Sequence, residues 1–419
     1  MKETLEYLYS LRNQGSSYGI ERMALLLSKM GCEVLSFPVI HVAGTNGKGS
    51  TCAMLDAIYR ENGYRVGLFS SPHFVELGER IKVDGEILPI EDLVQYVKIL
   101  RPLAEEIEKE NPTMRPSFFE LITAVAFYVF DEKKVDIAVL ETGLGGRLDS
   151  TNIVKPEISL ITTVSLDHCH ILGDTVEKIA REKSGIIKSG SPVITGWIPR
   201  EAEDVIREKA KENSSEFYSL SGESKERNLP DTNLAGFHQK RNAALALRAV
   251  ELIQHKFPIN HERTRDALCS VKLRGRWEII GKKPLIIMDA CHNQEGAETL
   301  EEQLLTLPEN QELVVWFGSL GVDRAAEIIS VITKFASEVR FFTPNQPRSC
   351  SYEDLSLLMP ESYVGIIQPG EVAEVEMYLQ KLERNQILLI TGSIYLLGEI
   401  MEAVKNNKNS YGSSFQDLV

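Results

Sequence analysis

A short segment near the N-terminus places three glycines, a lysine and three hydroxyl side chains directly after an apolar run. The run VIHVA (39–43) leads into GTNGKGST (44–51), and residues 52–60 are compatible with a helix. A strand, a glycine turn and a helix N-terminus together bind phosphate, because glycine lets backbone N–H groups approach the oxygens and lysine neutralises their charge. The spacing departs from the common GxxxxGKS/T loop, so an ordinary Gly/Asn turn is the alternative. The strand–turn–helix context favours phosphate binding, with Lys48 at its centre.

A second apolar run ends in a carboxylate. The run VLE (139–141) ends at Glu141 and continues into the glycine-rich segment TGLGGR (142–147). In open α/β sheets the C-terminal ends of the strands face the ligand crevice, and Mg²⁺ prefers carboxylate, hydroxyl and phosphate oxygens. We therefore expect Glu141 to bind the Mg²⁺ that accompanies a nucleotide triphosphate. A glutamate that only caps its strand is the alternative.

Three further residues carry weaker signals. His168 ends the segment ITTVSLDH (161–168); a lone histidine is more often structural, but its place at another strand end favours a role in the site. Ser71, in SSPH (70–73), belongs either to a turn or to the metal site as a hydroxyl ligand. Lys183 lies in a basic helical segment, and spacing alone predicts only a solvated face for it.

Polar side chains also follow an apolar run in the last third of the chain. Asp289 and His292, in DACHN (289–293), come directly after the expected strand 285–288. An aspartate at this point can simply cap the next helix, which is compatible with contact to a ligand. We expect these two residues to complete a site whose phosphate loop lies in the first half of the chain, with nucleotide held between two domains.

Composition limits the class of protein. With 419 residues the chain is long for one core, so two domains are expected. The net charge of −14 argues against a nucleic-acid surface. The six cysteines form no CxxC pair, which fits a reducing cytoplasm, and the N-terminus lacks a signal-peptide core. The most apolar helical segment, 117–130, is too short to span a bilayer.

The order of apolar and amphipathic runs predicts an α/β fold in two domains, 1–280 and 281–419. In the first, apolar runs at 39–43, 65–69, 136–141, 158–163 and 192–195 alternate with helical patterns, which is typical of a parallel sheet covered on both faces. In the second, strands are expected at 285–288, 312–317, 338–342, 363–366 and 386–390, in a smaller Rossmann-like arrangement. The polar stretch 275–284 is the expected hinge.

Taken together and in this order, the motifs resemble folylpolyglutamate synthase/dihydrofolate synthase, a branch of the Mur-ligase superfamily. The resemblance covers essentially the whole chain. It rests on YGIER (18–22), HVAGTNGKGS (41–50), LFSSPHF (68–74), VLETGLGGRLDSTN (139–152), RGRWE (274–278), DACHN (289–293) and further blocks between them. The resemblance implies a Mur-ligase-type ATP-binding domain in 1–280 and a Rossmann-like glutamate-ligase domain in 281–419.

The resemblance also implies a role for each matching residue. Nucleotide phosphates would be held by Asn46, Gly47, Lys48, Gly49 and Ser50, and other parts of the nucleotide by Asn242, Arg276, Asp289 and His292. Mg²⁺, as two ions, would be bound by Ser71, Glu141, His168 and Lys183, the last as a carbamate. The folate region would be lined by Phe119, Glu120, Arg147, Leu148, Asp149 and Ser150. Catalysis would depend on Lys48, Glu141, His168 and Lys183.

The implied reaction is ATP-dependent formation of an amide between a folate, or dihydropteroate, and L-glutamate. An acyl phosphate would be the intermediate, and ADP and phosphate the by-products. We expect a cytoplasmic monomer with small-molecule substrates only. Two alternatives remain: a muropeptide-type Mur ligase, which a UDP-linked substrate would stimulate, and a P-loop regulatory NTPase, which a protein partner would stimulate.

Overall fold

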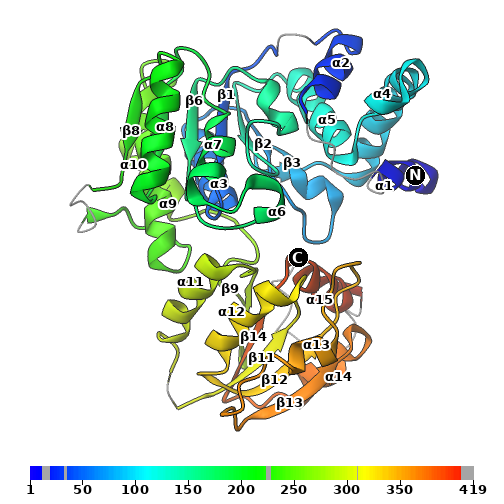
Figure 1. Ribbon diagram of the computed structural model, residues 1–419, viewed down its shortest axis with the longest axis vertical. Coiled ribbons are helices and arrows are strands. Elements are labelled where there is room, and N and C mark those ends of the chain that lie inside the picture. The colour runs from blue at the N-terminus through cyan, green and yellow to red at the C-terminus, as the bar shows by residue number, and fades with distance from the viewer. Residues whose placement is uncertain (12–18, 33–34, 223–227, 309, 407–419) are drawn as a thin grey trace. The chain divides into compact units, whose positions relative to one another are not determined.

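The computed structural model describes residues 1–11, 19–32, 35–222, 228–308 and 310–406, which form two compact units (Figure 1). Unit 1 contains Met1–Asn233 and Phe237–Val271, and unit 2 contains residues 234–236 and those from Lys272 onward. The expected boundary between residues 280 and 281 lies inside a strand, β9 (Glu278–Lys282). The stretch 275–284 that we expected to be a hinge is therefore partly an edge strand of unit 2.

Unit 1 is built on an eight-stranded sheet of order β4-β3-β2-β5-β1-β6-β7-β8. The strands are β1 (Val39–Ala43), β2 (Val66–Phe69), β3 (Ile81–Val83), β4 (Glu86–Ile87), β5 (Ile137–Glu141), β6 (Ile158–Ile161), β7 (Val193–Thr195) and β8 (Phe217–Ser219). β2, β5, β1, β6, β7 and β8 run parallel, whereas β3 and β4 pair antiparallel at one edge. The expected parallel sheet is therefore present, with a short antiparallel extension.

The strand order of unit 1 reverses at β1. From β1 the chain passes to β2 on one side, and from β5 it returns past β1 to β6 on the other side. Val42 is in register with Glu141, and Ala43 with Ile161, so the C-terminal ends of β1, β5 and β6 lie at one edge. Ligands of open α/β sheets bind at such a switch point, which places the site at the loops that follow these strands.

Helices of unit 1 gather at both ends of its sheet. α1 (Lys2–Ser10), α2 (Glu21–Lys29), α4 (Ile90–Glu110) and α5 (Phe118–Glu132) pack together near β3, and α8 (Arg200–Glu212) packs beside β8 (Figure 1). The remaining helices are α3 (Lys48–Glu61), α6 (Cys169–Leu172), α7 (Val176–Ser184), α9 (Phe237–Ile253) and α10 (His261–Leu268). β1 and β5 are buried along their whole length, and α3 packs against both strands, which explains their continuous apolar pattern.

Unit 2 is built on a six-stranded sheet of order β13-β12-β11-β14-β10-β9. Its other strands are β10 (Leu285–Asp289), β11 (Glu312–Phe317), β12 (Ala336–Phe342), β13 (Ile366–Gly370) and β14 (Gln386–Thr391). Its helices are α11 (Gln294–Leu304), α12 (Val322–Ile332), α13 (Tyr352–Ser356), α14 (Val375–Lys381) and α15 (Ile394–Asn406). Among the described strands of unit 2 only β9 is antiparallel, so the unit is Rossmann-like, as expected.

One predicted strand of unit 2 was misplaced. The sequence pattern favoured 363–366, but β13 spans Ile366–Gly370 and includes Pro369. Proline lacks an N–H and is confined to edge strands, and β13 is an edge strand. A Pro-Gly pair that reads as a turn in the sequence is therefore accommodated here in a strand. Among the helices described, none has both the length and the apolar character required to cross a membrane.

Candidate active site

The glycine turn after β1 is held against the end of β6. The backbone N–H of Thr45 donates to the Thr163 carbonyl at 2.8 Å, and that of Asn46 donates to the Thr163 hydroxyl at 3.0 Å. The Thr162 hydroxyl donates to the Asn46 carbonyl at 2.5 Å. Because the two residues that directly follow β6 supply partners for successive residues of the turn, the turn is fixed before any phosphate binds.

Two glycines of the turn are required by its conformation. Gly47 has φ 80°, and a Cβ there would lie 2.5 Å from Oδ1 of Asn242 on α9. Gly44 would place a Cβ 1.8 Å from the Thr162 hydroxyl oxygen. Asn242, a predicted nucleotide contact, is therefore packed directly on the turn, while its amide nitrogen donates to Gln239 at 3.1 Å. Gly47 caps α3, which begins at Lys48, so the helix N-terminus points into the same turn.

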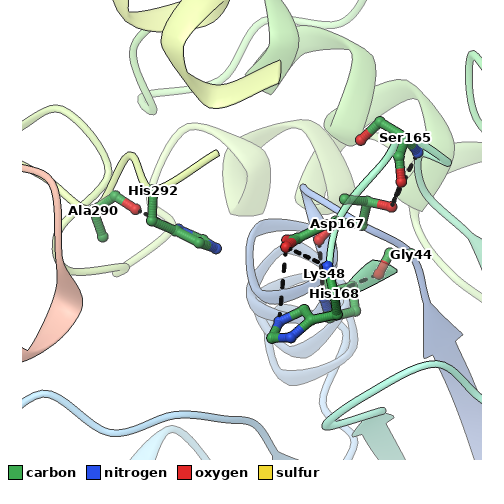
Figure 2. Close-up of polar contacts among 8 residues, drawn as sticks. Gly44, Lys48, Ser165, Asp167, His168, Ala290 and His292 are labelled. Atoms are coloured by element: carbon green, nitrogen blue, oxygen red, sulfur yellow. Dashed lines mark hydrogen bonds and ion pairs between the residues drawn. The ribbon is translucent and has the colours of Figure 1, made fainter. Parts of the chain in front are cut away.

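The Lys48 ammonium lies over the turn itself. Nζ donates to the carbonyl oxygens of Gly44 and of Thr45, each at 3.0 Å, and Figure 2 shows the bond to Gly44. The side chain is only partly buried. A cation held beside glycine N–H groups and a helix N-terminus could neutralise a phosphate oxygen. Asn46 and Gly49 are also partly accessible, whereas Ser50 is 3 % exposed.

Glu141 lies beside the N-terminus of α3. Its carboxylate oxygens are 3.7 and 3.8 Å from the position that a Cβ on Gly49 would take. Oε2 accepts the backbone N–H of Ser71 at 3.1 Å, and the side chain as a whole is 4 % exposed. The ends of β1, β2 and β5 therefore bring a glycine turn, a serine and a buried carboxylate together.

His168 belongs to the loop after β6. Its backbone N–H donates to Oδ1 of Asp167 at 2.8 Å, and its Nε2 lies 3.9 Å from the same oxygen. Figure 2 shows both contacts. The residue has φ 51°, a left-handed conformation that is uncommon outside glycine. Its neighbour Asp167 has a side chain that is 9 % exposed and lies beside the imidazole; sequence reasoning did not assign it a role.

Lys183 is buried rather than solvated. It lies in the last turn of α7 and is 3 % exposed. A Cβ on Gly146 would lie 2.8 Å from its carbonyl oxygen, so the glycine-rich segment after β5 packs directly on this turn. The solvated face that spacing alone predicts is therefore wrong for Lys183, because the loop from β5 covers that side of the helix.

Of the four predicted metal residues, Glu141 is the carboxylate and Ser71 offers a hydroxyl, both of which are oxygen groups that suit Mg²⁺. Across the described ranges, no group of three or more His, Cys, Asp or Glu side chains is arranged to hold a metal ion. Mg²⁺ commonly uses one or two carboxylates together with water and substrate phosphates. Glu141, next to the serine backbone and the phosphate loop, fits that mode of binding.

The predicted folate residues divide into accessible and internal groups. Phe119 is partly accessible; its ring packs on Gly143 and lies 5.7 Å from the Phe69 ring. Glu120, by contrast, is 3 % exposed and pairs with Arg22 at 2.9 Å. The second oxygen of Glu120 accepts the Ser117 N–H at 2.6 Å in the capping box of α5. The Glu120 carboxylate thus has structural partners of its own.

The segment from Arg147 to Ser150 shows the same division. Leu148 is partly accessible, and the side chain of Arg147 is 53 % exposed and pairs with Glu182 at 2.9 Å. Ser150 is 5 % exposed and shares a hydrogen bond of 2.8 Å with Thr123. Asp149 is 6 % exposed, and burial raises its pKa while hydrogen bonds from Thr151, Leu144 and Gly143 partly offset that effect.

In unit 2 the predicted residues meet at the end of β10. Asp289 accepts the backbone N–H of Trp277 at 2.8 Å and that of Cys291 at 3.0 Å. Burial raises the pKa of Asp289, against the opposing effect of the Arg276 guanidinium. The Ala290 carbonyl is approached by Arg276 Nη1 at 3.4 Å and by His292 Nδ1 at 2.9 Å, and Figure 2 shows the latter contact.

Sequence reasoning missed one buried polar residue beside the site. His41, in the middle of β1, is 0 % exposed, and its Nε2 lies 2.8 Å from the Thr151 hydroxyl. Burial, with a smaller contribution from the charge of Lys188, lowers its pKa to about 3. A histidine within an otherwise apolar strand was the available signal, but it was read only as part of the run.

Comparison with known proteins identifies the family of the chain. The family model of the Mur ligase middle domain matches residues 42–261, and that of the Mur ligase glutamate ligase domain matches residues 275–394. The chain is 35% identical to a Bacillus subtilis protein named dihydrofolate synthase/folylpolyglutamate synthase, over 93% of this chain and 96% of the relative. The chain belongs to the folylpolyglutamate synthase family of Mur ligases.

Further relatives in this family agree over nearly full length. The Escherichia coli dihydrofolate synthase/folylpolyglutamate synthase is 30% identical over 96% of this chain and 94% of its own. Folylpolyglutamate synthase from Thermotoga maritima has a TM-score of 0.82 at 33% identity, covering 98% of this chain and 97% of that one. E. coli FolC in complex with DHPP and ADP has a TM-score of 0.83 at 28% identity, covering 97% and 98%.

Proposed function

We propose that this protein is an ATP-dependent ligase that joins L-glutamate to folates, and that it also acts on dihydropteroate. The observation that carries the proposal is the meeting of Lys48, Glu141 and Ser71 at one edge of the sheet, in a chain of the folylpolyglutamate synthase family. The named activities of the relatives support the choice of substrates. The bound DHPP and ADP of the E. coli protein support a pterin compound and a nucleotide as ligands.

The phosphate loop positions ATP for attack. The backbone N–H groups of residues 46–49 and the N-terminus of α3 would bind the phosphate oxygens, and Lys48 would neutralise the γ-phosphate. Phosphoryl transfer depends mainly on such positioning and charge neutralisation. Because β6 already fixes the turn, little ordering is needed when ATP binds.

The reaction would proceed in two displacements. An oxygen of the folate carboxylate attacks the γ-phosphorus, the bond to the β–γ bridging oxygen breaks, and ADP leaves. The amine of L-glutamate then attacks the acyl carbon and loses a proton, and phosphate departs with the former carboxylate oxygen. The acyl phosphate hydrolyses in water, so the surrounding residues must exclude solvent until the amine arrives.

Metal binding is part of the same proposal. Ser71, Glu141, His168 and Lys183 would hold two Mg²⁺ ions, with the buried Glu141 carboxylate as the principal protein ligand. When bound, Mg²⁺ would neutralise charge on the phosphate oxygens during transfer. Asp167 would keep the His168 imidazole in place, since it lies within 3.9 Å of Nε2.

Lys183 would act as a carbamate. A free lysine, with a pKa of about 10.4, is a cation at neutral pH and adds repulsion where Mg²⁺ is to bind. Addition of CO₂ to the neutral amine forms a new N–C bond, releases one proton and leaves a carboxylate-like group, which suits Mg²⁺. Family resemblance, rather than local geometry, carries this part of the proposal. The alternative is an ammonium that binds a substrate carboxylate or phosphate directly.

The remaining predicted residues would contact the folate or the nucleotide, and their accessibility separates direct contacts from supporting ones. Phe119, Arg147 and Leu148 are accessible enough to touch the folate directly, whereas Glu120, Asp149 and Ser150 would shape that region from within. Asn242 in unit 1, and Arg276, Asp289 and His292 in unit 2, would contact the nucleotide. We further propose that the protein works as a monomer in the cytoplasm.

Substrate-dependent ATP consumption tests the proposed function. Purified protein is supplied with ATP, Mg²⁺ and L-glutamate, together with tetrahydrofolate, dihydropteroate or a UDP-linked muropeptide precursor. We expect ADP formation that requires both glutamate and a pterin substrate, with one amide formed per ADP. ADP formation that requires only the UDP-linked substrate would point to a muropeptide ligase. ADP formation that none of the three substrates stimulates would point to a regulatory NTPase.

A further inference from the structure

A chain of buried hydrogen bonds links β1 to the glycine-rich segment after β5, which we call the glycine loop (residues 142–152). His41 Nε2 lies 2.8 Å from the Thr151 hydroxyl, which in turn donates to Asp149 Oδ1 at 2.5 Å. All three residues are buried, at 0, 0 and 6 % exposure. The mechanism proposed above does not use His41 or Thr151.

The direction of these bonds follows from the number of hydrogens. Asp149 Oδ1 also accepts the Thr151 N–H at 3.0 Å, and Oδ2 accepts those of Gly143 and Leu144 at 2.8 and 2.9 Å. Every partner of this carboxylate is a donor, as an ionised carboxylate requires. The single hydroxyl hydrogen of Thr151 is therefore used on Asp149. His41 must then donate from Nε2. Because burial lowers its pKa to about 3, the ring is a neutral imidazole at neutral pH.

The other ring nitrogen confirms this one-sided use of the imidazole. Within the described structure, His41 Nδ1 is buried and has no hydrogen-bond partner. Lys188, whose ammonium donates to the Asn152 carbonyl at 2.9 Å, opposes a positive charge on the ring. His41 is thus buried in an apolar strand and uses a single ring nitrogen. Its one hydrogen bond goes to Thr151, so we infer that its function is to hold Thr151 in place.

The glycine loop connects several residues assigned to the reaction. It begins directly after Glu141, and Gly143 packs against the Phe119 ring, since a Cβ there would lie 2.5 Å from it. The loop also reaches α7, where the Arg147 N–H donates to the Glu182 carbonyl at 2.7 Å. The Asn152 amide donates to the carbonyls of Arg147 and Gly185, each at 3.0 Å. A shift of the loop would move Phe119 and α7 relative to Glu141.

We propose that His41 is a positioning residue for the ligase reaction, which acts through Thr151 and Asp149 to fix the glycine loop beside Glu141 and Phe119. The inference rests on the proposed function for its kinetic consequences and on the hydrogen bonds alone for its structural ones. The phosphate turn does not depend on these bonds, because its partners are Thr162 and Thr163. Loss of the donor should therefore impair turnover and folate use more than ATP binding.

A pair of substitutions at His41 separates donation from packing. The amide nitrogen of glutamine reaches the position of Nε2, whereas that of asparagine reaches only the position of Nδ1. We expect kcat to fall about 10- to 100-fold in His41→Leu and His41→Asn, as for loss of a residue that orients a ligand. The KM for the folate substrate should rise and that for ATP should stay within about twofold. His41→Gln should recover most of the loss.

Thr151→Val provides a second variant that leaves β1 intact. Thr195→Val is its matched control, because Thr195 is also 0 % exposed in unit 1 and its hydroxyl has no partner among the described residues. We expect Thr151→Val to reproduce the kinetic pattern of His41→Leu and Thr195→Val to behave as wild type. Equal activity of the glutamine and asparagine variants, or wild-type kinetics in a folded Thr151→Val protein, would overturn the proposal.

Two measurements that need no turnover test the hydrogen-bond chain His41–Thr151–Asp149 independently of the proposed function. Nitrogen NMR of ¹⁵N-histidine-labelled protein should show His41 as a neutral imidazole protonated on Nε2. Hydrogen exchange at the amides of Gly143 and Leu144 should be faster in His41→Leu than in wild type or His41→Gln. A proton on Nδ1 of His41, or unchanged amide exchange at Gly143 and Leu144 in His41→Leu, would refute this hydrogen-bond chain even in an active ligase. If wild-type protein fails to ligate glutamate, the proposed function is wrong, and these two measurements still test the hydrogen-bond chain.

Discussion

The Lys48 ammonium donates to the Gly44 and Thr45 carbonyls, and we propose that it neutralises the γ-phosphate of ATP. We predict that Lys48→Ala abolishes ATP-dependent product formation and leaves the fold intact, because the partly accessible Lys48 side chain donates to carbonyls of its own turn. Circular dichroism and steady-state ligation check the two halves of the prediction. Lys209→Ala, a change at an exposed lysine on α8 whose partner is Glu212, is the control. Near-normal turnover in folded Lys48→Ala would contradict the phosphate role.

Glu141 provides the second residue-scale test. We predict that Glu141→Gln removes at least a large part of the activity and that added Mg²⁺ does not fully restore it. The amide keeps the side-chain shape and still offers an oxygen to the Ser71 N–H, but it loses the charge that Mg²⁺ prefers. Metal titration followed by calorimetry in the presence of ADP gives the affinity directly. Wild-type Mg²⁺ affinity in the variant would make Glu141 a purely structural residue.

Because of His41, the free energy of unfolding should decrease as the pH falls. Its pKa is lowered from 6.5 to about 3 in the folded protein. Between these values the unfolded chain binds the proton and the folded chain does not, so this group makes unfolding easier as the pH falls. The slope is about 1.4 kcal/mol per pH unit. From about pH 7.5 to about pH 5, wild type should lose about 2 kcal/mol more stability than His41→Gln in urea unfolding. An equal loss in both proteins would show that His41 takes up no charge on unfolding.

At the scale of elements, the junction of β1 and α3 depends on Gly47. Gly47 has φ 80° and Gly63, just beyond the other end of α3, has φ 88°, but only at Gly47 would a Cβ meet a neighbour, Asn242. Both alanine variants should lose about 1 to 2 kcal/mol of stability through left-handed strain. Only Gly47→Ala should also raise the KM for ATP, because the turn must move away from α9. Equal KM values in the two variants would contradict this account of the turn.

The elements that the sequence predicted best are those whose pattern reflects burial on both faces. β1 and β11 were predicted at their observed bounds, since each is a fully or almost fully buried apolar run. β4 and β9 were missed because edge strands are short and largely exposed, and their sequence resembles polar loops. Lys183 was misread for a related reason: its burial comes from the glycine loop, a contact between segments far apart in the sequence that helical periodicity does not reveal.

At the scale of the whole molecule, we propose that unit 2, which matches the Mur ligase glutamate ligase domain, contributes to nucleotide binding. Arg276, Asp289 and His292 meet at the end of β10, where the His292 ring contacts the Ala290 carbonyl. We predict that His292→Ala raises the KM for ATP or lowers kcat at least severalfold while the phosphate loop of unit 1 is unchanged. His255→Ala, at a histidine of unit 1 to which we assign no role, is the control. Unchanged kinetics in His292→Ala would remove His292 from the nucleotide site.

The central claim is that ATP activates the folate carboxylate before glutamate arrives. Transfer of oxygen from that carboxylate to phosphate tests it most directly, because an acyl phosphate forms only if a carboxylate oxygen attacks the γ-phosphorus. The protein is incubated with ATP, Mg²⁺, L-glutamate and a folate substrate labelled with ¹⁸O in the reacting carboxylate, and the released phosphate is analysed by mass spectrometry. We predict one labelled oxygen in each phosphate, in step with amide formation. Unlabelled phosphate, or phosphate released at the same rate without the folate, would contradict the account.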